Sequence, residues 1–533
     1  MNPKRLSLLI LATLIGILLA CGTPPLTTGD ETPLADARTT VQPTEKRPTP
    51  QRSASAVPPA QTPAPGPLPA PVGQAYYVAA NEPHASDANN GRFPTYRSGS
   101  DGPWLTIRYA AATMRPGDIT YVRAGTYAEA GIRFANSGTP DAPIVLANFQ
   151  SEQVIIDGSQ ATARSSGIEI AKGCSHVVIQ GLTIRHMPRS GIATDSDTQV
   201  LYQGITIRDC VLHDNGLSGL RLAAATGFLV EHVEAYGNAY DGLDIVSSDD
   251  GALSPGPGVV RGSSFHDHIE PEGHGLAINQ GHDITVSDCQ AYHNAVHGFD
   301  VSDWPKRGEQ SHDIVVEGSL SYDNGVAGFS INSDSHHVAY RNNIAWRNGA
   351  DWAGKGSSSG FLCYEGCWHV EFYNNVAVGN TDAGFWVTDA YGSYSTPGDS
   401  RLVFKNNVAY DNGRADWRGL ALMVEGMVWQ VETAHNDWGG ASGLNALVVA
   451  IHVVGGQGET YTTDQVNSGA LGEGESSADP RFVDLVAGDF RLQPGSPLID
   501  AGTDVSVPFC GVAPDMGAIE VCPFTSGFIS RTS

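Results

Sequence analysis

The sequence predicts an all-β fold in which short parallel strands stack into a solenoid, that is, a parallel β-helix. Three observations support this prediction. A short segment ending in Asn recurs, mostly at intervals of about 23 to 32 residues, and a period in this range is typical of repeat folds. Each repeat contains three short strands with no helical periodicity. A Gly also recurs at a fixed place in the repeat, before the third strand.

The repeat is clearest where its segments are written beneath one another. They are residues 210–215, 233–238, 289–294, 319–324, 343–348, 375–380 and 407–412. Each is followed by a Gly-apolar-x-apolar strand, as at residues 219–222, and preceded by a short alternating strand, as at residues 283–286. The interval varies, which indicates loops of different length around a constant coil.

The recurrent Asn suits a turn in which side-chain amides hydrogen-bond from coil to coil. We therefore expect Asn215, Asn238, Asn294, Asn324, Asn348, Asn380 and Asn412 to align. The recurrent Gly suits a tight turn with positive φ. A β-propeller is the competing fold, but it needs four strands per ~40–45 residues and hairpin turns, and the repeat has neither.

The first twenty residues have the features of an export signal. Lys4 and Arg5 precede an apolar run at residues 6–19, which is shorter than the roughly 20 residues of a membrane span. The end of the run, Leu-Leu-Ala-Cys, resembles the lipobox of bacterial lipoproteins. This resemblance implies lipidation of Cys21 and a location outside the cytoplasm, anchored to the cell membrane or outer membrane. An ordinary cleaved signal that ends in Cys is the alternative.

The rest of the chain divides by composition. Residues 21–73 are rich in Pro and Thr, and such a segment cannot bury enough apolar surface to fold, so it predicts a disordered linker. We expect an N-terminal cap with the first strands at residues 74–147, the β-helix at residues 148–440 and a β-rich C-terminal cap at residues 441–533.

The charge balance limits the possible partners. The 533 residues include 31 Lys and Arg against 57 Asp and Glu, a formal net charge of -26. Nucleic acids and anionic membranes bind basic surfaces, so we expect no nucleic-acid partner and membrane contact only through the lipid anchor. An anionic substrate would need a bound cation or a local basic patch. We expect a monomer.

The cysteines fall into pairs and repeat positions. Cys363 lies close to Cys367 and Cys510 close to Cys522, so both pairs could form disulfides in an oxidising compartment. Their scattered spacing argues against zinc. Cys210 and Cys289 occupy equivalent repeat positions, where we expect small buried apolar side chains.

Across residues 74–520 the chain resembles secreted right-handed β-helix proteins of the polysaccharide-lyase type. Residues 104–110, 115–118 and 122–127 resemble their N-terminal cap, and residues 479–483 and 490–502 resemble their closing segment. The resemblance implies right-handed coils. It says less about the substrate, because this fold carries several unrelated activities.

Two outward positions of the repeat concentrate acidic and basic side chains. In order along the chain they are Arg221, Asp244, Ala277 and Asp300 two residues after the Gly, and Asp241, His274 and His297 just before it. Neighbouring coils lie about 4.8 Å apart, so the Asp and His residues should share one surface patch.

An acidic patch outside the cell favours Ca²⁺, a hard cation that takes six to eight oxygen ligands. We therefore expect Ca²⁺ to be held by carboxylates of the patch and of the loop that follows its first coil. These are Asp241, Asp244, Asp249, Asp250 and Asp300. Acidic residues that merely cap turns in a solvated solenoid are the alternative.

The same residues resemble the site of the family 9 pectate lyases. Residues 240–244, Tyr-Asp-Gly-Leu-Asp, resemble the family's Asp-Asp-Gly-x-Asp calcium motif with Tyr240 in the first position. Residues 273–277 resemble its Gly-Asn-Gly-Phe-Lys segment, whose Lys removes the sugar proton, but Ala277 stands in the position of that Lys. Residues 297–300 match its Lys-Gly-Phe-Asp segment except for His297.

Without a Lys at position 277, another group must accept the proton. The candidates for the base are Arg221, His274, His297 and Lys306. A guanidinium beside a carboxylate such as Asp244 is more often a salt bridge, and an exposed turn residue is the alternative for each His. We expect Arg307 to bind carboxylates of the substrate, and Trp304 and Trp386 to contact the sugars, since flat rings suit the apolar faces of pyranoses. Loop packing is the alternative for each ring.

The sequence thus predicts a surface-anchored, Ca²⁺-dependent lyase that cleaves an acidic polysaccharide such as pectate by β-elimination. One alternative is a non-catalytic glycan-binding or adhesion protein, for which Ala277 is the best indication. The other is a β-helix glycoside hydrolase or uronate epimerase that works through the carboxylates of Asp241, Asp244 and Asp300.

Overall fold

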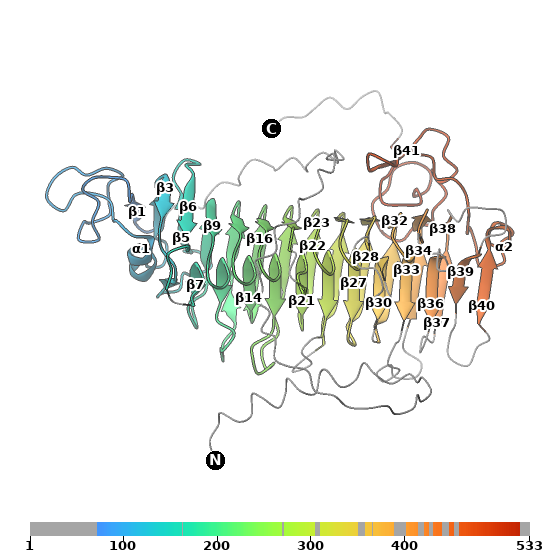
Figure 1. Ribbon diagram of the computed structural model, residues 1–533, viewed down its shortest axis with the longest axis horizontal. Coiled ribbons are helices and arrows are strands. Elements are labelled where there is room, and N and C mark those ends of the chain that lie inside the picture. The colour runs from blue at the N-terminus through green and yellow to red at the C-terminus, as the bar shows by residue number, and fades with distance from the viewer. Residues whose placement is uncertain are drawn as a thin grey trace, which may run out of the picture. The chain divides into compact units, whose positions relative to one another are not determined.

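Three parallel sheets run along the described part of the chain, and each coil adds one strand to each sheet (Figure 1). The structure is a computed structural model. It describes residues 72–162, 164–268, 271–303, 310–349, 358–364, 366–388, 401–413, 420–425, 430–439, 447–451 and 458–522.

The first sheet has thirteen strands among these residues. In spatial order they are β1 (Ala75–Val78), β2 (Ile119–Val122), β5 (Ile144–Asn148), β8 (Val177–Gln180), β12 (Thr206–Arg208), β16 (Phe228–Glu231), β19 (Gly258–Arg261), β22 (His282–Ser287), β25 (His312–Glu317), β28 (His336–Arg341), β31 (Trp368–Tyr373), β34 (Arg401–Lys405) and β37 (Gln430–Ala434).

The second sheet, which carries the candidate site, also has thirteen described strands. They are β4 (Ile132–Phe134), β7 (Ile168–Ile170), β10 (Ile192–Thr194), β14 (Leu220–Ala223), β18 (Leu243–Val246), β21 (Leu276–Asn279), β24 (Phe299–Ser302), β27 (Phe329–Asn332), β30 (Ser359–Tyr364), β33 (Ala383–Thr388), β36 (Leu420–Glu425), β39 (Leu447–Ile451) and β40 (Glu459–Thr462).

The third sheet has twelve described strands. They are β3 (Gly125–Tyr127), β6 (Val154–Asp157), β9 (Leu182–Arg185), β13 (Val211–His213), β17 (Glu234–Tyr236), β20 (Ser264–His266), β23 (Gln290–Tyr292), β26 (Leu320–Tyr322), β29 (Ile344–Trp346), β32 (Val376–Val378), β35 (Val408–Tyr410) and β38 (Asp437–Trp438). Two further pairs are β11 (Tyr202–Gln203) with β15 (Ala225–Thr226), and β41 (Phe482–Asp484) with β42 (Asp489–Leu492).

Strands of successive coils pair in parallel and in register. Leu243 pairs with Leu276 and Leu276 with Phe299, for example, so equivalent residues of consecutive coils are direct neighbours. The last strand of the second sheet, β40, is antiparallel to β39, and β41 is antiparallel to β42. The predicted parallel β-helix is confirmed.

Alternate residues of each strand point inward and form one continuous core. Leu243 and Ile245 of β18 are fully buried in it, so Asp244 between them faces outward. Stacked phenylalanines extend through several coils, with ring centroids 4.9 Å apart between Phe329 and Phe361 and 4.7 Å apart between Phe361 and Phe385. Such stacks repeat one side-chain contact at every coil.

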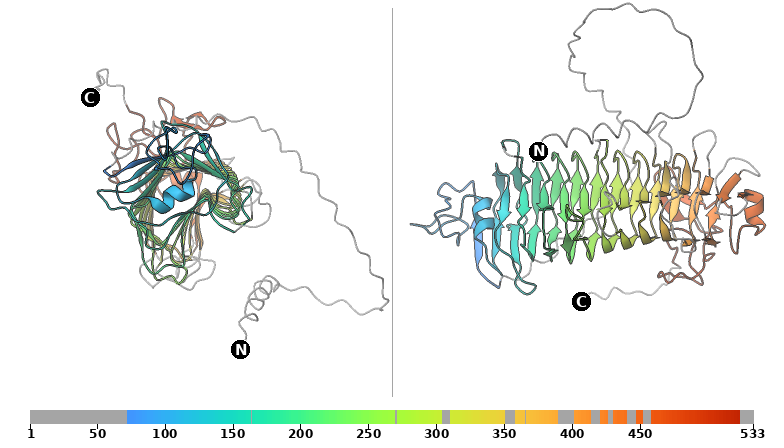
Figure 2. Two further views of the ribbon diagram at one scale, coloured as in Figure 1. Left: turned by 90° about the vertical axis from the view of Figure 1, so that its left-hand side faces the viewer. Right: turned by 90° about the horizontal axis from the view of Figure 1, so that it is seen from below.

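The two ends of the described coils differ from the repeat. The helix α1 (Ile107–Thr113) lies across the end of the coil interior and buries Ile107, Ala110 and Ala111 in the core (Figure 2). The second helix, α2 (Thr463–Asn467), follows β40 directly and begins with a capping box between Thr462 and Gln465. Neither helix, nor any other in the described residues, has the length and apolar character needed to cross a membrane.

The recurrent asparagines form the predicted ladder. Asn348 shows the pattern: its Oδ1 accepts from the backbone N of Asn324 at 3.2 Å and from its Nδ2 at 3.0 Å, while its own N and Nδ2 donate to Asn380 at 3.0 Å each. The same bonds join the other members, from Asn215 to Asn238 and from Asn294 to Asn412. The expected alignment is confirmed.

One coil of this ladder was missed by the sequence alignment. It contains β20, and its ladder position is His268 rather than Asn. The backbone N of Asn238 donates to His268 Nδ1 at 3.2 Å, and the backbone N of His268 donates to Asn294 Oδ1 at 3.3 Å. The imidazole therefore replaces one amide without breaking the series.

A second ladder lies five residues earlier in each repeat. The backbone N of Asn343 donates to Asn375 Oδ1, that of Asn375 to Asn407 Oδ1, and that of Asn407 to Asn436 Oδ1, at 3.0, 3.0 and 2.9 Å. In earlier coils this position is held by Cys289 and Ser319. Cys210 and Cys289 are buried, as expected.

The predicted reason for the recurrent glycine, a turn with positive φ, was wrong. Gly242, Gly275 and Gly298 do not have positive φ. A Cβ at Gly242 would instead lie 2.6 Å from the carbonyl oxygen of Gly275, and one at Gly275 would lie 2.5 Å from that of Gly298. Close approach of successive coils, not a left-handed turn, therefore requires glycine here.

Two disulfides lie within the described residues, and they join Cys363 to Cys367 and Cys510 to Cys522. Cys21 and the export segment lie outside the described residues, so their roles stay predictions. The same holds for the linker at residues 21–73, and the other segment boundaries also stay predictions.

We expect Asn348→Ala to lower the free energy of unfolding by on the order of 3 kcal/mol. It leaves the buried backbone N–H of Asn324 without its acceptor, and it removes the bonds that the Asn348 amide makes to Asn324 Nδ2, Ser321 O and Asn380 Oδ1. Urea denaturation of the full chain measures the change. Asn81→Ala is the control, since it removes one exposed bond, from Asn81 Nδ2 to Ala124 O, and should cost less than about 1 kcal/mol. Equal losses in the two variants would contradict a structural role for the ladder.

Candidate active site

The outward residues of the second sheet form one column from coil to coil. Strand register places Arg221 of β14 beside Asp244 of β18, Asp244 beside Ala277 of β21, and Ala277 beside Asp300 of β24. The column predicted from the sequence is thus present, and Ala277 stands between two carboxylates.

A second column runs beside the first, just before the recurrent glycines. Hydrogen bonds from Gly242 N to His274 O and from Gly275 N to His297 O place Asp241, His274 and His297 on adjacent coils. The imidazole centroids of His274 and His297 are 5.3 Å apart. We call the five residues Asp241, Asp244, His274, His297 and Asp300 the Asp/His cluster.

The Asp/His cluster is more buried than its sequence suggested. The sequence predicted a surface patch, yet the exposed fractions are 1% for Asp241, 2% for Asp244, 5% for Asp300 and 7% for His297. Burial disfavours the charged form of an ionisable group.

The pKa values of Asp241, Asp300, His274 and His297 shift toward the neutral form of each group. Burial, and then the neighbouring carboxylate of Asp244, raise the pKa of Asp241 well above its usual value. Burial raises the pKa of Asp300 to about 7. It lowers the pKa of His274 to about 4, and burial together with His274 lowers the pKa of His297. Both imidazoles are therefore neutral at neutral pH.

The carboxylates have different partners. Asp244 forms an ion pair with Arg221, which compensates its buried charge. Asp241 Oδ1 accepts a hydrogen bond from the backbone N of His274 at 2.9 Å. Asp300 Oδ1 accepts one from Asn332 Nδ2 at 2.9 Å. Arg221 thus forms the salt bridge with Asp244 that was the alternative to its role as the base.

Three members of the cluster are close enough to share a cation. His274, His297 and Asp300 each offer one ligand atom, and these atoms lie within 4.8 Å of one another. The Nδ1 atoms of both imidazoles are buried without a hydrogen-bond partner, so each is available to a ligand or a proton.

The other predicted metal ligands lie in the turn after β18. Asp249 and Asp250 are exposed there. The carboxylate of Asp250 accepts hydrogen bonds from Ser248 Oγ at 2.6 Å and from the backbone N of Ala252 at 3.1 Å, both within its own turn. Their role as metal ligands stays a prediction.

The predicted sugar-binding residues are placed only in part. Trp386 lies on the outward column, paired with Leu362, but it is 3% exposed and packs with Leu362 and Ala383. Its ring thus contacts apolar side chains. Trp304, Lys306 and Arg307 lie outside the described residues, so their predicted roles stay predictions.

A groove that the sequence reading missed adjoins the cluster. It has a volume of about 150 Å³ and lies over β4, β7, β10 and β14. Its charged lining residues are Arg133, Arg164, Glu169, Arg189, Asp195 and Arg221, and we call it the arginine groove. The Gly-Ile-x-apolar pattern at residues 131–134 and 167–170, and the related Gly-Ile-Ala-Thr at residues 191–194, could have revealed these coils, since they match the later repeats.

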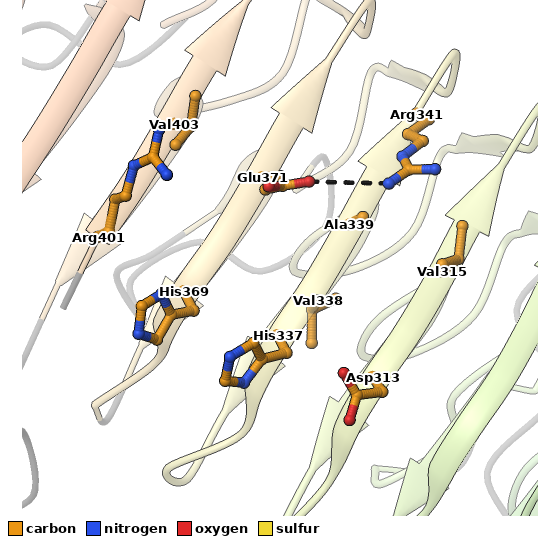
Figure 3. A pocket seen from close by; sticks show the side chains of 10 residues that line it. All are labelled: Asp313, Val315, His337, Val338, Ala339, Arg341, His369, Glu371, Arg401 and Val403. Atoms are coloured by element: carbon orange, nitrogen blue, oxygen red, sulfur yellow. Dashed lines mark ion pairs between the residues drawn. The ribbon is translucent and has the colours of Figure 1, made fainter. Parts of the chain in front are cut away.

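A second hollow lies on the first sheet, over β25, β28, β31 and β34, with a volume of about 300 Å³. Figure 3 shows His337 and His369 side by side in it, with ring centroids 4.7 Å apart. Its arginines are paired with acids: Arg341 lies 3.7 Å from Glu371, and Arg401 lies 2.6 Å from Glu432. The described residues that line this hollow therefore carry no excess of positive charge.

Comparison with known families finds the β-helix along most of the described coils. The model described as the Pel9A-like, right-handed β-helix region matches residues 90–360. A general model of the right-handed β-helix region matches residues 309–464.

Among curated proteins, pectate lyase PEL9 of Emericella nidulans is 26% identical over 223 residues, which are 38% of this chain and 53% of that enzyme. The chain thus spans about half the length of this relative. Among solved structures, XylC in complex with xylose has a TM-score of 0.51 at 12% identity and covers 74% of this chain and 90% of its own. The structure of pectate lyase Pel9A has a TM-score of 0.46 at 19% identity, and the match covers 84% of this chain and 96% of the Pel9A chain. At such identities the likeness to XylC shows the fold.

We expect Asp300→Asn to stabilise the protein at pH 8, measured by urea denaturation with a chelator present. The pKa of Asp300 is about 7 in the folded state and about 4 when unfolded. Between these values the folded state binds more protons, so the wild type loses stability as pH rises through this window. The advantage of the variant should be on the order of 4 kcal/mol above pH 7 and vanish near pH 4.

The control for this experiment is Asp283→Asn, which changes an exposed carboxylate of β22. Its effect on the free energy of unfolding should be small throughout the pH range. A difference between wild type and Asp300→Asn that does not depend on pH would contradict the raised pKa.

Proposed function

This chain belongs to the family of Pel9A-like right-handed β-helix proteins, whose model matches residues 90–360, and we propose that it cleaves an acidic polysaccharide by β-elimination. The observation that carries the proposal is the position of the Asp/His cluster at the end of the arginine groove, where Arg221 lines the groove and forms an ion pair with Asp244 of the cluster. The name of the Emericella nidulans relative, a pectate lyase, supports pectate as the substrate.

The proposal includes the location. An acidic polysaccharide is met outside the cytoplasm, which agrees with the export-type N-terminus. We propose that lipid on Cys21 anchors the protein to the cell membrane or outer membrane and that the linker at residues 21–73 separates the β-helix from it. Extracytoplasmic cysteines also favour disulfides such as Cys510–Cys522.

Ca²⁺ is the cation we propose, and the residues present fit it. Asp241 and Asp244 offer hard oxygen donors, and they are close enough for Asp244 to raise the pKa of Asp241. Asp300 adds a third carboxylate two coils away along the same column. When bound, the cation would neutralise the carboxylate of a uronate unit and make its neighbouring C–H bond more acidic.

The chain's own residues would then receive the proton. His274 and His297 are neutral at neutral pH and have unpartnered Nδ1 atoms, so either can accept it. The electron pair of the broken C–H bond forms the C=C bond, the glycosidic C–O bond breaks, and the leaving oxygen takes a proton from water. Ala277 offers no amine, so the role of the family's Lys falls to an imidazole.

A second candidate function is binding of the polysaccharide without cleavage. Ala277 favours it, because the position of the catalytic Lys in the family 9 pectate lyases holds a methyl group here. The arginine groove would serve either function, so only product formation separates them.

Replacing both Asp241 and Asp244 by Asn should abolish Ca²⁺ binding, because it removes two negative charges from a hard-cation site. Ca²⁺ should raise the melting temperature of the wild type and not of the variant. Formation of unsaturated product from polygalacturonate should fall by roughly two orders of magnitude, as it should for the wild type with a chelator. The double variant Asp283→Asn/Asp313→Asn, which loses two exposed acids of the first sheet, is the control. Ca²⁺-independent cleavage would refute the cation proposal.

Ala277→Lys should raise the rate of product formation, because the new amine would project between Asp244 and Asp300, at the position of the family's base. Ala277→Met is the matched control, since it adds a chain of similar length without the amine. Ala277 is 2% exposed, so circular dichroism must first show that both variants fold. No cleavage by wild type or Ala277→Lys, with both folded, would favour the binding protein.

A further inference from the structure

We propose that the arginine groove is an anion-binding subsite that holds the carboxylates of the sugar units next to the one at the Asp/His cluster. This inference rests on the proposed function, since it assigns the adjoining units of the same polysaccharide. The ligand class is an oligosaccharide with a carboxylate on successive units. Binding of such an oligosaccharide requires three features of the groove: guanidinium groups that are free to bind, a path to the Asp/His cluster, and a spacing of the arginines that matches a repeating anion.

The arginines converge from four successive coils. Arg133 lies on β4 and Arg221 on β14, and the outward column joins them through Glu169 of β7 and Ala193 of β10. Arg164 and Arg189 lie in the turns before β7 and β10 and also line the groove. With a rise of about 4.8 Å per coil, the groove presents positive charge at regular steps along the axis.

The groove has positive charge to spare. Arg133 lies 3.2 Å from Glu169 and 4.0 Å from Asp195, and these are the acids of the lining. Arg164 and Arg189 are exposed, and no ion pair joins either to another described residue. A guanidinium binds a carboxylate through two parallel N–H donors, so these two side chains are suited to a ligand anion.

The clustering of arginines in the groove contrasts with the net negative charge of the whole protein. The chain has 31 Lys and Arg against 57 Asp and Glu, so its surface would repel a polyanion at most places. Four arginines in a cavity of about 150 Å³ give one region where a polyanion can approach. The larger hollow of Figure 3 also contains two arginines, but Glu371 and Glu432 are paired with them.

The groove leads directly to the Asp/His cluster. Arg221 lines the groove and forms the ion pair with Asp244, one coil further. A chain lying along the outward column would therefore pass from Arg133 to Asp300 without leaving the second sheet. The groove then sets the length and charge of the substrate, while the cluster performs the reaction.

The test is binding of galacturonate oligomers to the full chain carrying Asp241→Asn and Asp244→Asn, with a chelator present, so that neither cleavage nor a cation contributes. In this background we add Arg164→Gln and Arg189→Gln together and measure affinity by calorimetry at several salt concentrations. We expect long oligomers to bind about tenfold more weakly after the change and with a smaller dependence on salt. A monomeric uronate should bind equally to both proteins.

The matched control is Arg341→Gln with Arg401→Gln, which removes two arginines from the hollow on the first sheet and should leave oligomer affinity unchanged. Equal affinity of the Arg164/Arg189 variant and its parent, or an equal loss in the control, would overturn the inference. Preferred binding of sulfated over carboxylated oligomers would overturn the assigned ligand class. If oligomer binding depends on Arg164 and Arg189 but the wild type cleaves no polymer, the result would support the anion-binding subsite. It would contradict only the proposed lyase activity.

Discussion

Contact between successive coils is the constraint on which every other feature depends. Parallel backbone pairing sets a rise of about 4.8 Å, and two side-chain features enforce it. The amide ladder ties each coil to the next, as between Asn348 and Asn380, and glycines such as Gly275 let the backbones approach. Residues far apart in sequence, such as Asp244 and Ala277, thereby become neighbours. Strand register therefore assembles the outward column of the site.

This geometry places charges where water cannot stabilise them. Burial raises the pKa of Asp241 and Asp300 and lowers those of His274 and His297. Among the described residues, Arg221 supplies a countercharge to Asp244, and no ion pair joins Asp241 or Asp300 to a described basic residue. If Asp241 and Asp300 ionise, the cluster is short of positive charge, and a cation would relieve this deficit.

The fold could be predicted from the sequence because its signals repeat. Asn at one position and Gly at another recur often enough to identify the coils, and the column from Arg221 to Asp300 follows from counting residues after the Gly. The coil of His268 was missed because imidazole replaces the amide there, and a pattern search for Asn passes over it. Hydrogen-bonding capacity, not residue type, is what the position requires.

Other features could not be derived from local sequence. Burial of Asp241 and Asp300 depends on packing over the outward face of the second sheet, which no single repeat encodes. The role of the recurrent glycine depends on the distance to the next coil. The arginine groove combines side chains from four coils, and two of them, Arg164 and Arg189, come from turns outside the aligned positions. Such features become visible only when the coils are stacked.

The in-register stacking of the coils has one more consequence, which concerns measurement. Because every coil adds the same rise, the outward column from Arg133 through Arg221 to Asp300 works as a molecular ruler with one graduation per coil. Loops can lengthen or shorten without moving any residue of this column. Loss or duplication of one coil between β7 and β18, in contrast, would shift arginines of the groove relative to the histidines by the rise of one coil. The polymer length that such a protein selects would therefore change by whole coil steps, through gain or loss of repeats, rather than gradually through point substitutions.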